Sequence, residues 1–182
     1  MRKRFLKLFI VISLIMGGAI VLIPLESHAE DVTVTVTVQS TISLSLSGTP
    51  SATNVLPNSK VEGTDSSFYT LASVTTNSTA GYTLTVIDKD TDNSLKAGSH
   101  SIPATASNSL TAGTAAWGYR VSGDTDWLAM PKSDGTAAGI ASSNTYSASA
   151  QNTTIQYGVA TAAGQAAGSY TDVITYTATA KT

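Results

Sequence analysis

The amino-acid sequence predicts an all-β protein, a two-sheet antiparallel β-sandwich that follows a cleaved N-terminal signal peptide. Two observations carry the sandwich prediction. Short runs with apolar residues at every second position recur along the chain, and clusters of Gly, Asn, Asp and Ser separate them. Apolar residues at the three-and-four spacing of an amphipathic helix are absent over any window of useful length. Several short strands without helices are typical of two packed antiparallel sheets.

Residues 1–29 have the organisation of a secretory signal peptide. Arg2, Lys3, Arg4 and Lys7 open the chain, an apolar stretch covers residues 8–25, and small residues stand at 27 and 29. An uncleaved membrane anchor is the alternative, because about 18 apolar residues lie near the lower limit for a span. Pro24 and the small residues favour cleavage after Ala29. We therefore expect residues 30–182 to form a single β-sandwich domain that is secreted, extracellular and displayed at the cell surface.

Charge and cysteine content exclude several classes of partner. The chain has 10 Lys and Arg against 12 Asp and Glu, a formal net charge of −2, and four of the basic residues lie in the signal peptide. The remainder is weakly acidic without a basic cluster, so nucleic acid is not an expected partner. Because there is no cysteine, folding rests on burial and sheet hydrogen bonds. Membrane contact is expected only through the signal segment, if it is uncleaved.

The most regular alternation is DVTVTVTVQSTISLSL, residues 31–46. At about 3.3 Å per residue, such a strand spans roughly 50 Å, about twice the usual length. Two alternatives are open for this long N-terminal strand of residues 31–47. It bends near residues 39–41 and serves both sheets, or its first half projects and adds to the sheet of another subunit. In the second alternative the assembly strand presents Val32, Val34, Val36 and Val38.

Five further runs predict the other principal strands. They are FYTLASVTT (68–76), GYTLTVID (81–88), AAWGYRVSG (115–123), TTIQYGVAT (153–161) and GSYTDVITYTATA (168–180). DWLAMP (126–131) predicts a short strand or corner, and residues 88–109 and 132–144 are expected to be loops. Tyr170 predicts a tyrosine corner, in which the hydroxyl group bonds a backbone group of a loop. Strand order stays open, and a closed barrel is the alternative architecture.

Three stretches resemble exported bacterial proteins. QYGVATAAGQAAGSYTDVITYTATA (156–180) resembles the closing strands of pilin-like and spore-coat-type surface subunits. GYTLTV (81–86) and WGYRV (117–121) resemble exported Ig-like surface modules. The chain lacks the cysteine pair usual in chaperone-assembled pilins, and it has Trp-Leu-Ala at residues 127–129 where WxL proteins carry Trp-x-Leu. The resemblance implies a bacterial secreted surface protein with an Ig-like β-sandwich module, and it does not indicate a ligand.

The segment DKDTDN places Asp88, Asp90 and Asp92 at alternate positions, like the start of a calcium-binding loop. The later positions of such a loop do not match, because Asn93 replaces the expected Gly and Ser99 replaces the expected Glu. A solvated turn between two strands is the competing interpretation. We therefore expect no cofactor, with calcium at these three residues as the one candidate.

Trp127 and the neighbouring Asp124 and Asp126 form a candidate carbohydrate-binding group. An exposed indole ring stacks on a sugar ring, and carboxylates accept hydrogen bonds from its hydroxyl groups. The competing interpretation places Trp127, with Trp117 and Tyr119, in the core, because large aromatic side chains supply most of the burial in a chain poor in Phe.

No catalytic constellation is predicted. Beyond the signal peptide the one histidine is His100, in AGSHSIP, which has no nucleophile-elbow motif and too few companions for zinc. The acidic residues cluster in turns, whereas a glycosidase needs two carboxyl groups at a defined separation. We predict an exported, non-enzymatic cell-surface structural or adhesive subunit whose partners are other surface subunits or cell-envelope or host glycans. A carbohydrate-binding module, assisted by calcium, is the alternative function.

Overall fold

The computed structural model describes residues 32–182, and all ten regular elements in that range are β-strands. They are β1 (Ile42–Thr49), β2 (Lys60–Glu62), β3 (Tyr69–Thr76), β4 (Tyr82–Asp88), β5 (Leu95–Ala97), β6 (His100–Ile102), β7 (Ala116–Val121), β8 (Ala138–Ser143), β9 (Ser147–Ala160) and β10 (Ile174–Ala180). The all-β prediction is confirmed for this part of the chain. The predicted signal peptide, residues 1–29, and Asp31 lie outside the described residues.

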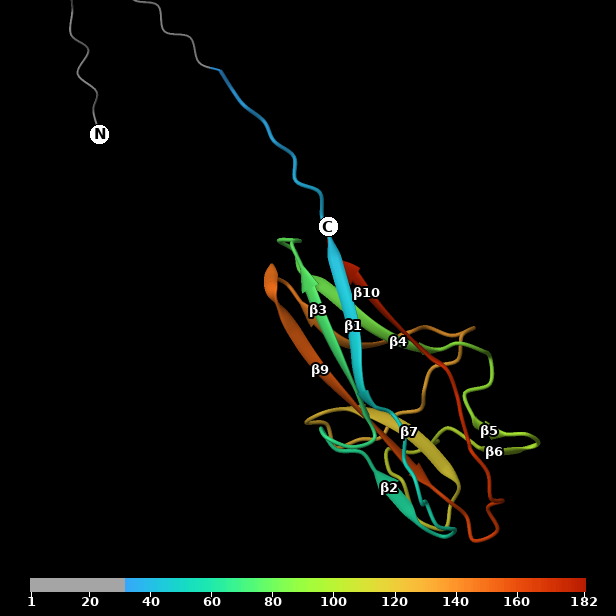
Figure 1. The fold of residues 1–182 in the computed structure, drawn as a ribbon. Helices are drawn as coiled ribbons and strands as arrows, with labels where there is room; N and C mark the ends of the chain where they lie inside the picture. Colours follow the sequence, from blue (N-terminus) through green and yellow to red (C-terminus); the bar gives the residue numbers. More distant parts are fainter. Residues whose placement is uncertain (1–31) are drawn as a thin grey trace, which may run out of the picture. The chain divides into compact units, whose positions relative to one another are not determined.

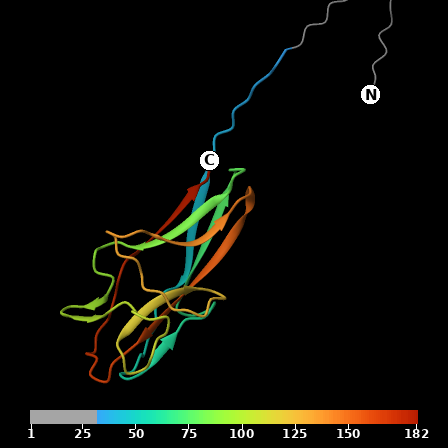
Figure 2. The same cartoon turned by 180° about the vertical axis from the view of Figure 1, so that it is seen from behind.

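The strands form antiparallel sheets of five, three and two strands (Figure 1). The five-stranded sheet has the order β1-β3-β9-β2, with β7 also paired to β9, and the three-stranded sheet has the order β10-β4-β8. β5 and β6 form a hairpin that lies apart from both larger sheets, as the view from behind also shows (Figure 2). All ten strands lie in the compact unit Gln39–Thr182.

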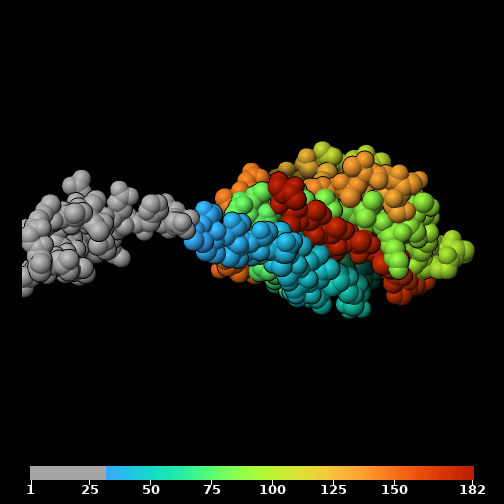
Figure 3. All heavy atoms as spheres, turned by 90° about the horizontal axis from the view of Figure 1, so that it is seen from above, coloured from blue at the N-terminus to red at the C-terminus, as the bar shows by residue number. Residues whose placement is uncertain are grey.

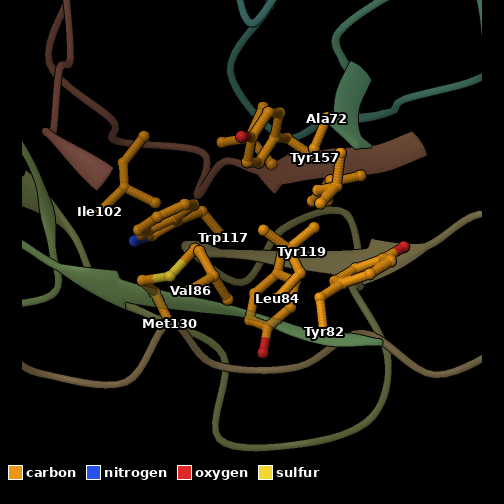
Figure 4. Packing of buried hydrophobic residues seen from close by; sticks show 12 residues of the cluster. Ala72, Tyr82, Leu84, Val86, Ile102, Trp117, Tyr119, Met130 and Tyr157 are labelled. Atoms are coloured by element: carbon orange, nitrogen blue, oxygen red, sulfur yellow. The ribbon is translucent and has the colours of Figure 1, made fainter. Parts of the chain in front are cut away.

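The two larger sheets bury their facing side chains in one core. Along β3 and β4 every second residue is buried, and Ala72, Val74, Leu84 and Val86 have no exposed surface. Figure 4 shows the side chains of β4 facing those of β3, β7 and β9. The other buried members of this cluster are Tyr82, Ile102, Trp117, Tyr119, Met130, Ile155, Tyr157 and Val159. At the edges of the larger sheets, β1 and β10 lie side by side (Figure 3).

Two tyrosine hydroxyl groups join the larger sheets inside this core. Tyr157 Oη of β9 is hydrogen-bonded to Tyr176 Oη of β10, and it lies 2.9 Å from Thr70 Oγ1 of β3. Burial raises the pKa of both Tyr157 and Tyr176 above the ordinary value of a phenol. The hydroxyl groups of Thr70, Tyr157 and Tyr176 therefore satisfy one another across the interface between the sheets.

Tyr170 anchors the loop that leads into β10. Its hydroxyl group donates to the Ala166 carbonyl group at 2.8 Å and accepts from Gln165 Nε2 at 2.7 Å. This bond from a tyrosine hydroxyl to a loop carbonyl is the contact predicted for Tyr170, so that prediction is confirmed.

The predicted start of the first strand is wrong. β1 begins at Ile42, and residues 32–41 are assigned to no strand. The partner strand explains the difference, because Ile42 stands opposite Thr76, where β3 ends. Further towards the N-terminus no strand of residues 32–182 lies in register, so the bent strand that would serve both sheets is not formed.

Two predicted loops contain strands. Residues 132–144 include β8, and residues 88–109 include the β5–β6 hairpin. β9 also begins at Ser147, earlier than predicted, because its polar first half pairs with β3. DWLAMP forms a corner whose one bridge joins Leu128 to Tyr119. Apart from Ile140, β8 and the first half of β9 consist of small or polar residues, so they lack the alternation that marks a half-buried strand.

Removing the tyrosine link tests the joint between the sheets. Tyr176→Phe is expected to lower the free energy of unfolding at pH 7 by about 1 kcal/mol, because one buried hydrogen bond is lost. The folded pKa of Tyr176 exceeds 10.0, the ordinary value of a tyrosine phenol. The stabilisation is therefore present below pH 10 and is lost above it, where only the unfolded phenol ionises. The difference between wild type and variant should shrink in urea titrations between pH 9 and about pH 11. Tyr146→Phe, at a side chain that is 55% exposed, is the control. It should change neither the free energy of unfolding at pH 7 nor its dependence on pH.

Candidate functional site

The predicted assembly segment, residues 32–38, presents a row of exposed valine side chains. Val32, Val34, Val36 and Val38 are 86, 82, 80 and 79% exposed. No other residues in the described part of the chain combine β-branched side chains and strict alternation with such exposure. Exposed apolar side chains gathered on one face mark interaction sites more often than chance surface residues do.

Asn77 terminates the hydrogen-bonded backbone at the start of β1. Its Oδ1 accepts from the Thr41 amide at 2.6 Å, and its Nδ2 donates to the Gln39 carbonyl group at 2.8 Å. The Thr76 hydroxyl group donates to the Thr41 carbonyl group at 2.9 Å. One amide side chain thus replaces the strand partner that residues 39–41 lack beyond the end of β3. Such side-chain bonds satisfy backbone groups where a ladder ends.

Among the strands of residues 32–182, β1, β2, β7, β8 and β10 each pair with one other strand only. β8 pairs with β4 alone, and residues 147–153 of β9 pair with β3 alone. The sequence of β8, AGIASS, contains neither the charged residue nor the proline that commonly protects an edge strand. Ala138, Ile140 and Ala141 of β8 are half-buried and pack against the core. The β8 edge is therefore an open hydrogen-bonding edge beside apolar side chains.

Trp127 is buried, with 3% of its surface exposed. The Arg120 guanidinium group lies over the indole, 4.4 Å from the ring centroid, and the ring belongs to a small cluster with Leu110 and Ala160. Asp126 Oδ2 accepts from Asn108 Nδ2 at 3.0 Å. Asp124 is exposed in the turn after β7. The structure therefore supports the core interpretation of Trp127, and the predicted sugar-stacking surface finds no support in it.

Asp88, Asp90 and Asp92 do not converge on one point. Asp88 Oδ1 accepts from the Asp90 amide at 2.8 Å, and Asp90 Oδ1 accepts from the Asp92 amide at 2.7 Å. Each of these carboxylates caps the amide two residues on, as in Asx turns. Asp92 also forms an ion pair with Lys96 at 3.1 Å. Across residues 32–182 no group of three or more His, Asp or Glu side chains is arranged to hold a metal ion.

The structure instead brings Asp172 to Asp88, a pairing that the sequence reasoning missed. Ile174, two residues after Asp172, pairs with Asp88, and burial, reinforced by the nearby Asp88 carboxyl group, raises the pKa of Asp172 to about 7. The Oδ2 atoms of both residues are buried and have no hydrogen-bond partner among the described residues. The sequence does contain one signal for this pairing. Asp172 lies at the same alternate spacing as Ile174 and Tyr176, so it is expected on the same face of the strand.

His100 is exposed at the start of β6. Within residues 32–182 no helix has the length and apolar character needed to cross a membrane. No family model, no curated protein and no solved structure matches this chain. Its function is therefore inferred from its own residues and their geometry.

A substitution at Gly158 tests the burial of Trp127. A Cβ atom at Gly158 of β9 would lie 2.8 Å from two ring carbon atoms of Trp127. Gly158→Ala is therefore expected to lower the free energy of unfolding by about 1–3 kcal/mol through overpacking. Gly139→Ala is the matched control, since no atom lies within 4 Å of its Cβ position. Urea unfolding followed by tryptophan fluorescence measures both variants, and equal midpoints would show that the indole does not pack on β9.

Proposed function

We propose that this chain is an exported, non-catalytic structural or adhesive subunit of the bacterial cell surface. Its domain would be an Ig-like β-sandwich, and residues 32–38 would assemble the subunits. The observation that carries the proposal is the row of four exposed valines, which has a strand pattern and belongs to no strand of this chain. The signal-peptide pattern of residues 1–29 and the resemblance of residues 156–180 to surface subunits support export and display.

Strand addition is the binding mode that suits residues 32–38. An extended segment at a sheet edge pairs its backbone groups with that edge and turns alternate side chains towards one face. Its seven residues span roughly 23 Å at about 3.3 Å each, which is long enough to cover the six residues of β8. Both the valine row and the backbone of the segment would then be satisfied in one contact.

The proposed acceptor is the β8 edge of a second copy. β8 has no charged residue to repel an added strand, and its half-buried Ile140 lies at the margin of the core. Valines added beside Ile140 would extend the apolar layer of the three-stranded sheet. Because the donor segment and the acceptor edge are different surfaces, the contact is heterologous and repeats from copy to copy. Such a contact builds rings or linear assemblies, as expected of a structural subunit.

The non-catalytic part of the proposal is supported by how the polar groups are used. The Asp88 and Asp90 carboxylates cap backbone amides, and the Asp92 carboxylate pairs with Lys96. Trp127 is enclosed by Arg120 and Leu110 instead of facing solvent. Catalysis needs a nucleophile, a base and an orienting group within mutual reach, and His100 stands exposed on a two-stranded hairpin.

Removing the donor segment tests assembly. The chain without its signal peptide is expected to form species larger than a monomer as its concentration rises, measured by light scattering after size exclusion. Deleting residues 32–38 should give a monomer with an unchanged melting temperature, because the unit Gln39–Thr182 keeps all ten strands. A wild type that stays monomeric at every concentration would refute strand donation.

Point variants separate the valine face from the segment as a whole. Val34→Thr combined with Val36→Thr keeps strand propensity but removes two apolar contacts, each worth about 1 kcal/mol, so assembly should weaken about 30-fold. Thr33→Ser with Thr35→Ser changes the opposite face and is the matched control. Equal weakening in both pairs would show that the valines do not face the acceptor.

Interchain disulfides locate the acceptor edge, since the native chain has no cysteine. A Val34→Cys chain mixed with a Gly139→Cys chain should give a mixed dimer under mild oxidation, because Gly139 of β8 has open space at its Cβ position. A Ser149→Cys chain provides the competing acceptor on β9. A product with Ser149→Cys in place of Gly139→Cys would assign the acceptor edge to β9 and overturn the assignment to β8.

A further inference from the structure

We propose that Asp88 and Asp172 bind a hard divalent cation, calcium, at one end of the three-stranded sheet. This ligand pair differs from the predicted loop of Asp88, Asp90 and Asp92, because it joins two strands that are distant in sequence.

The backbone fixes both carboxylates on the core side of their strands. In β4 the buried row Tyr82, Leu84 and Val86 continues to Asp88. In β10 the corresponding row of Ile174 and Tyr176 packs against the core, and Asp172 lies two residues before it. Ile174 stands directly opposite Asp88, and the Lys89 amide donates to the Val173 carbonyl group at 2.9 Å. Two inward rows of neighbouring strands therefore end in a carboxylate at the same end of the sheet.

Each carboxylate has one oxygen atom satisfied and one left over. Asp88 Oδ1 accepts from the Asp90 amide at 2.8 Å, and Asp172 Oδ1 accepts from the Val173 amide at 2.7 Å. Both Oδ2 atoms are buried without a hydrogen-bond partner in the described part of the chain, and Asp88 as a whole is only 1% exposed. Burying two facing negative charges costs several kcal/mol unless a positive group neutralises them.

The nearby lysines do not supply that neutralising group. Lys96 Nζ is engaged by the Asp92 carboxylate at 3.1 Å, on the exposed surface. Lys89 is exposed and lies just beyond the end of β4. The negative charge of Asp90 also acts on Asp172. The position between the two free Oδ2 atoms is therefore strongly favourable for a cation.

The donor atoms favour calcium. Both free ligand atoms are carboxylate oxygens, which hard cations prefer to the nitrogen and sulfur ligands typical of zinc. Calcium accepts six to eight oxygen ligands in flexible geometry, so water can complete the shell on the half-exposed side of Asp172, whereas magnesium demands a strict octahedron. With two carboxylates from the chain, we expect a dissociation constant on the order of 10⁻⁴–10⁻³ M, as in extracellular calcium modules.

A proton shared between Asp88 and Asp172 is the competing way to relieve their repulsion. The groups that act on the pair are Asp90, whose charge opposes ionisation of Asp172, and Lys96, which Asp172 and Asp90 attract. A shared proton stabilises the fold as the pH falls below about 7, whatever the calcium concentration. A calcium site stabilises it at pH 8, where the proton is absent.

Thermal unfolding of the full chain at pH 8 distinguishes these two possibilities. Relative to a chelator, 10 mM calcium chloride is expected to raise the melting temperature by about 3–6 °C, and magnesium should raise it less. Terbium provides a second readout, because the Trp117 indole belongs to the same core cluster as Val86, two residues before Asp88 (Figure 4), and an indole sensitises a terbium ion bound nearby. Added calcium should displace the bound terbium and so lower its sensitised luminescence.

Two variants make the test specific. Asp172→Asn is expected to raise the melting temperature in chelator, because its amide can donate to Asp88 Oδ2, and to abolish the calcium response. Glu62→Gln removes one charge from β2 in the other large sheet, where Glu62 pairs with Lys60, and it should keep the full response. If Asp172→Asn does not fold, displacement of terbium from the wild type by calcium still decides the question.

A wild-type melting temperature that calcium leaves unchanged at pH 8 would overturn the proposal. If it then rises between pH 8 and pH 6 equally with and without calcium, the pair holds a shared proton. The deletion of residues 32–38 should keep the calcium response, so failure of this site and failure of strand donation are distinguishable.

Discussion

Backbone hydrogen bonding is the constraint from which the rest of this structure follows. The chain has no cysteine, and residues 32–182 contain no helix, so buried amides find their partners mainly across strands. β3 ends at Thr76, and β1 therefore begins at Ile42 directly opposite. Asn77 satisfies the backbone just beyond this point and closes the ladder at Gln39. The segment before Gln39 keeps a strand's side-chain pattern, and no strand of residues 32–182 lies in register with it, which is why an intermolecular partner is the simplest completion of the sheet.

The same constraint explains which parts of the fold the sequence could predict. Leu84 and Val86 made β4 predictable because one face of that strand is buried. A strand with one buried face has apolar residues at every second position of its sequence. β8 leaves no such mark, since Ile140 is the one large apolar residue of AGIASS and the others are small enough to suit either face. In residues 31–46 alternation predicted a strand throughout, whereas the partner needed to form it depends on where a distant strand ends. Local pattern thus specifies the face of a strand, and tertiary pairing specifies its length.

At the candidate sites, the local spacing of residues likewise predicted individual residues but not the partners that they contact. The series 88, 90 and 92 identified Asp88 as a candidate ligand. Its neighbour Asp172, however, lies two residues before β10 and is found only through the register of β4 and β10. Local spacing selected Trp127 because two aspartates flank it, while the burial of the indole depends on Gly158, which leaves room for the ring against β9. The role of each of these side chains depends on which residues of a neighbouring strand contact it. Those contacts cannot be predicted from the local pattern of a single sequence.

The two proposals meet in β4. Its residues 82–86 hydrogen-bond to β8, the proposed acceptor edge, and its last residue is Asp88. Unneutralised repulsion between Asp88 and Asp172 acts to separate β4 from β10, and β4 is the strand on which β8 depends for its pairing. A cation of about 10⁻⁴–10⁻³ M affinity would fill this site only where calcium is abundant, and it would strengthen the acceptor sheet without contacting the donor segment. On this combination of proposals the subunit reaches its most rigid, assembly-competent state after export, because the ion that completes the sheet is then plentiful.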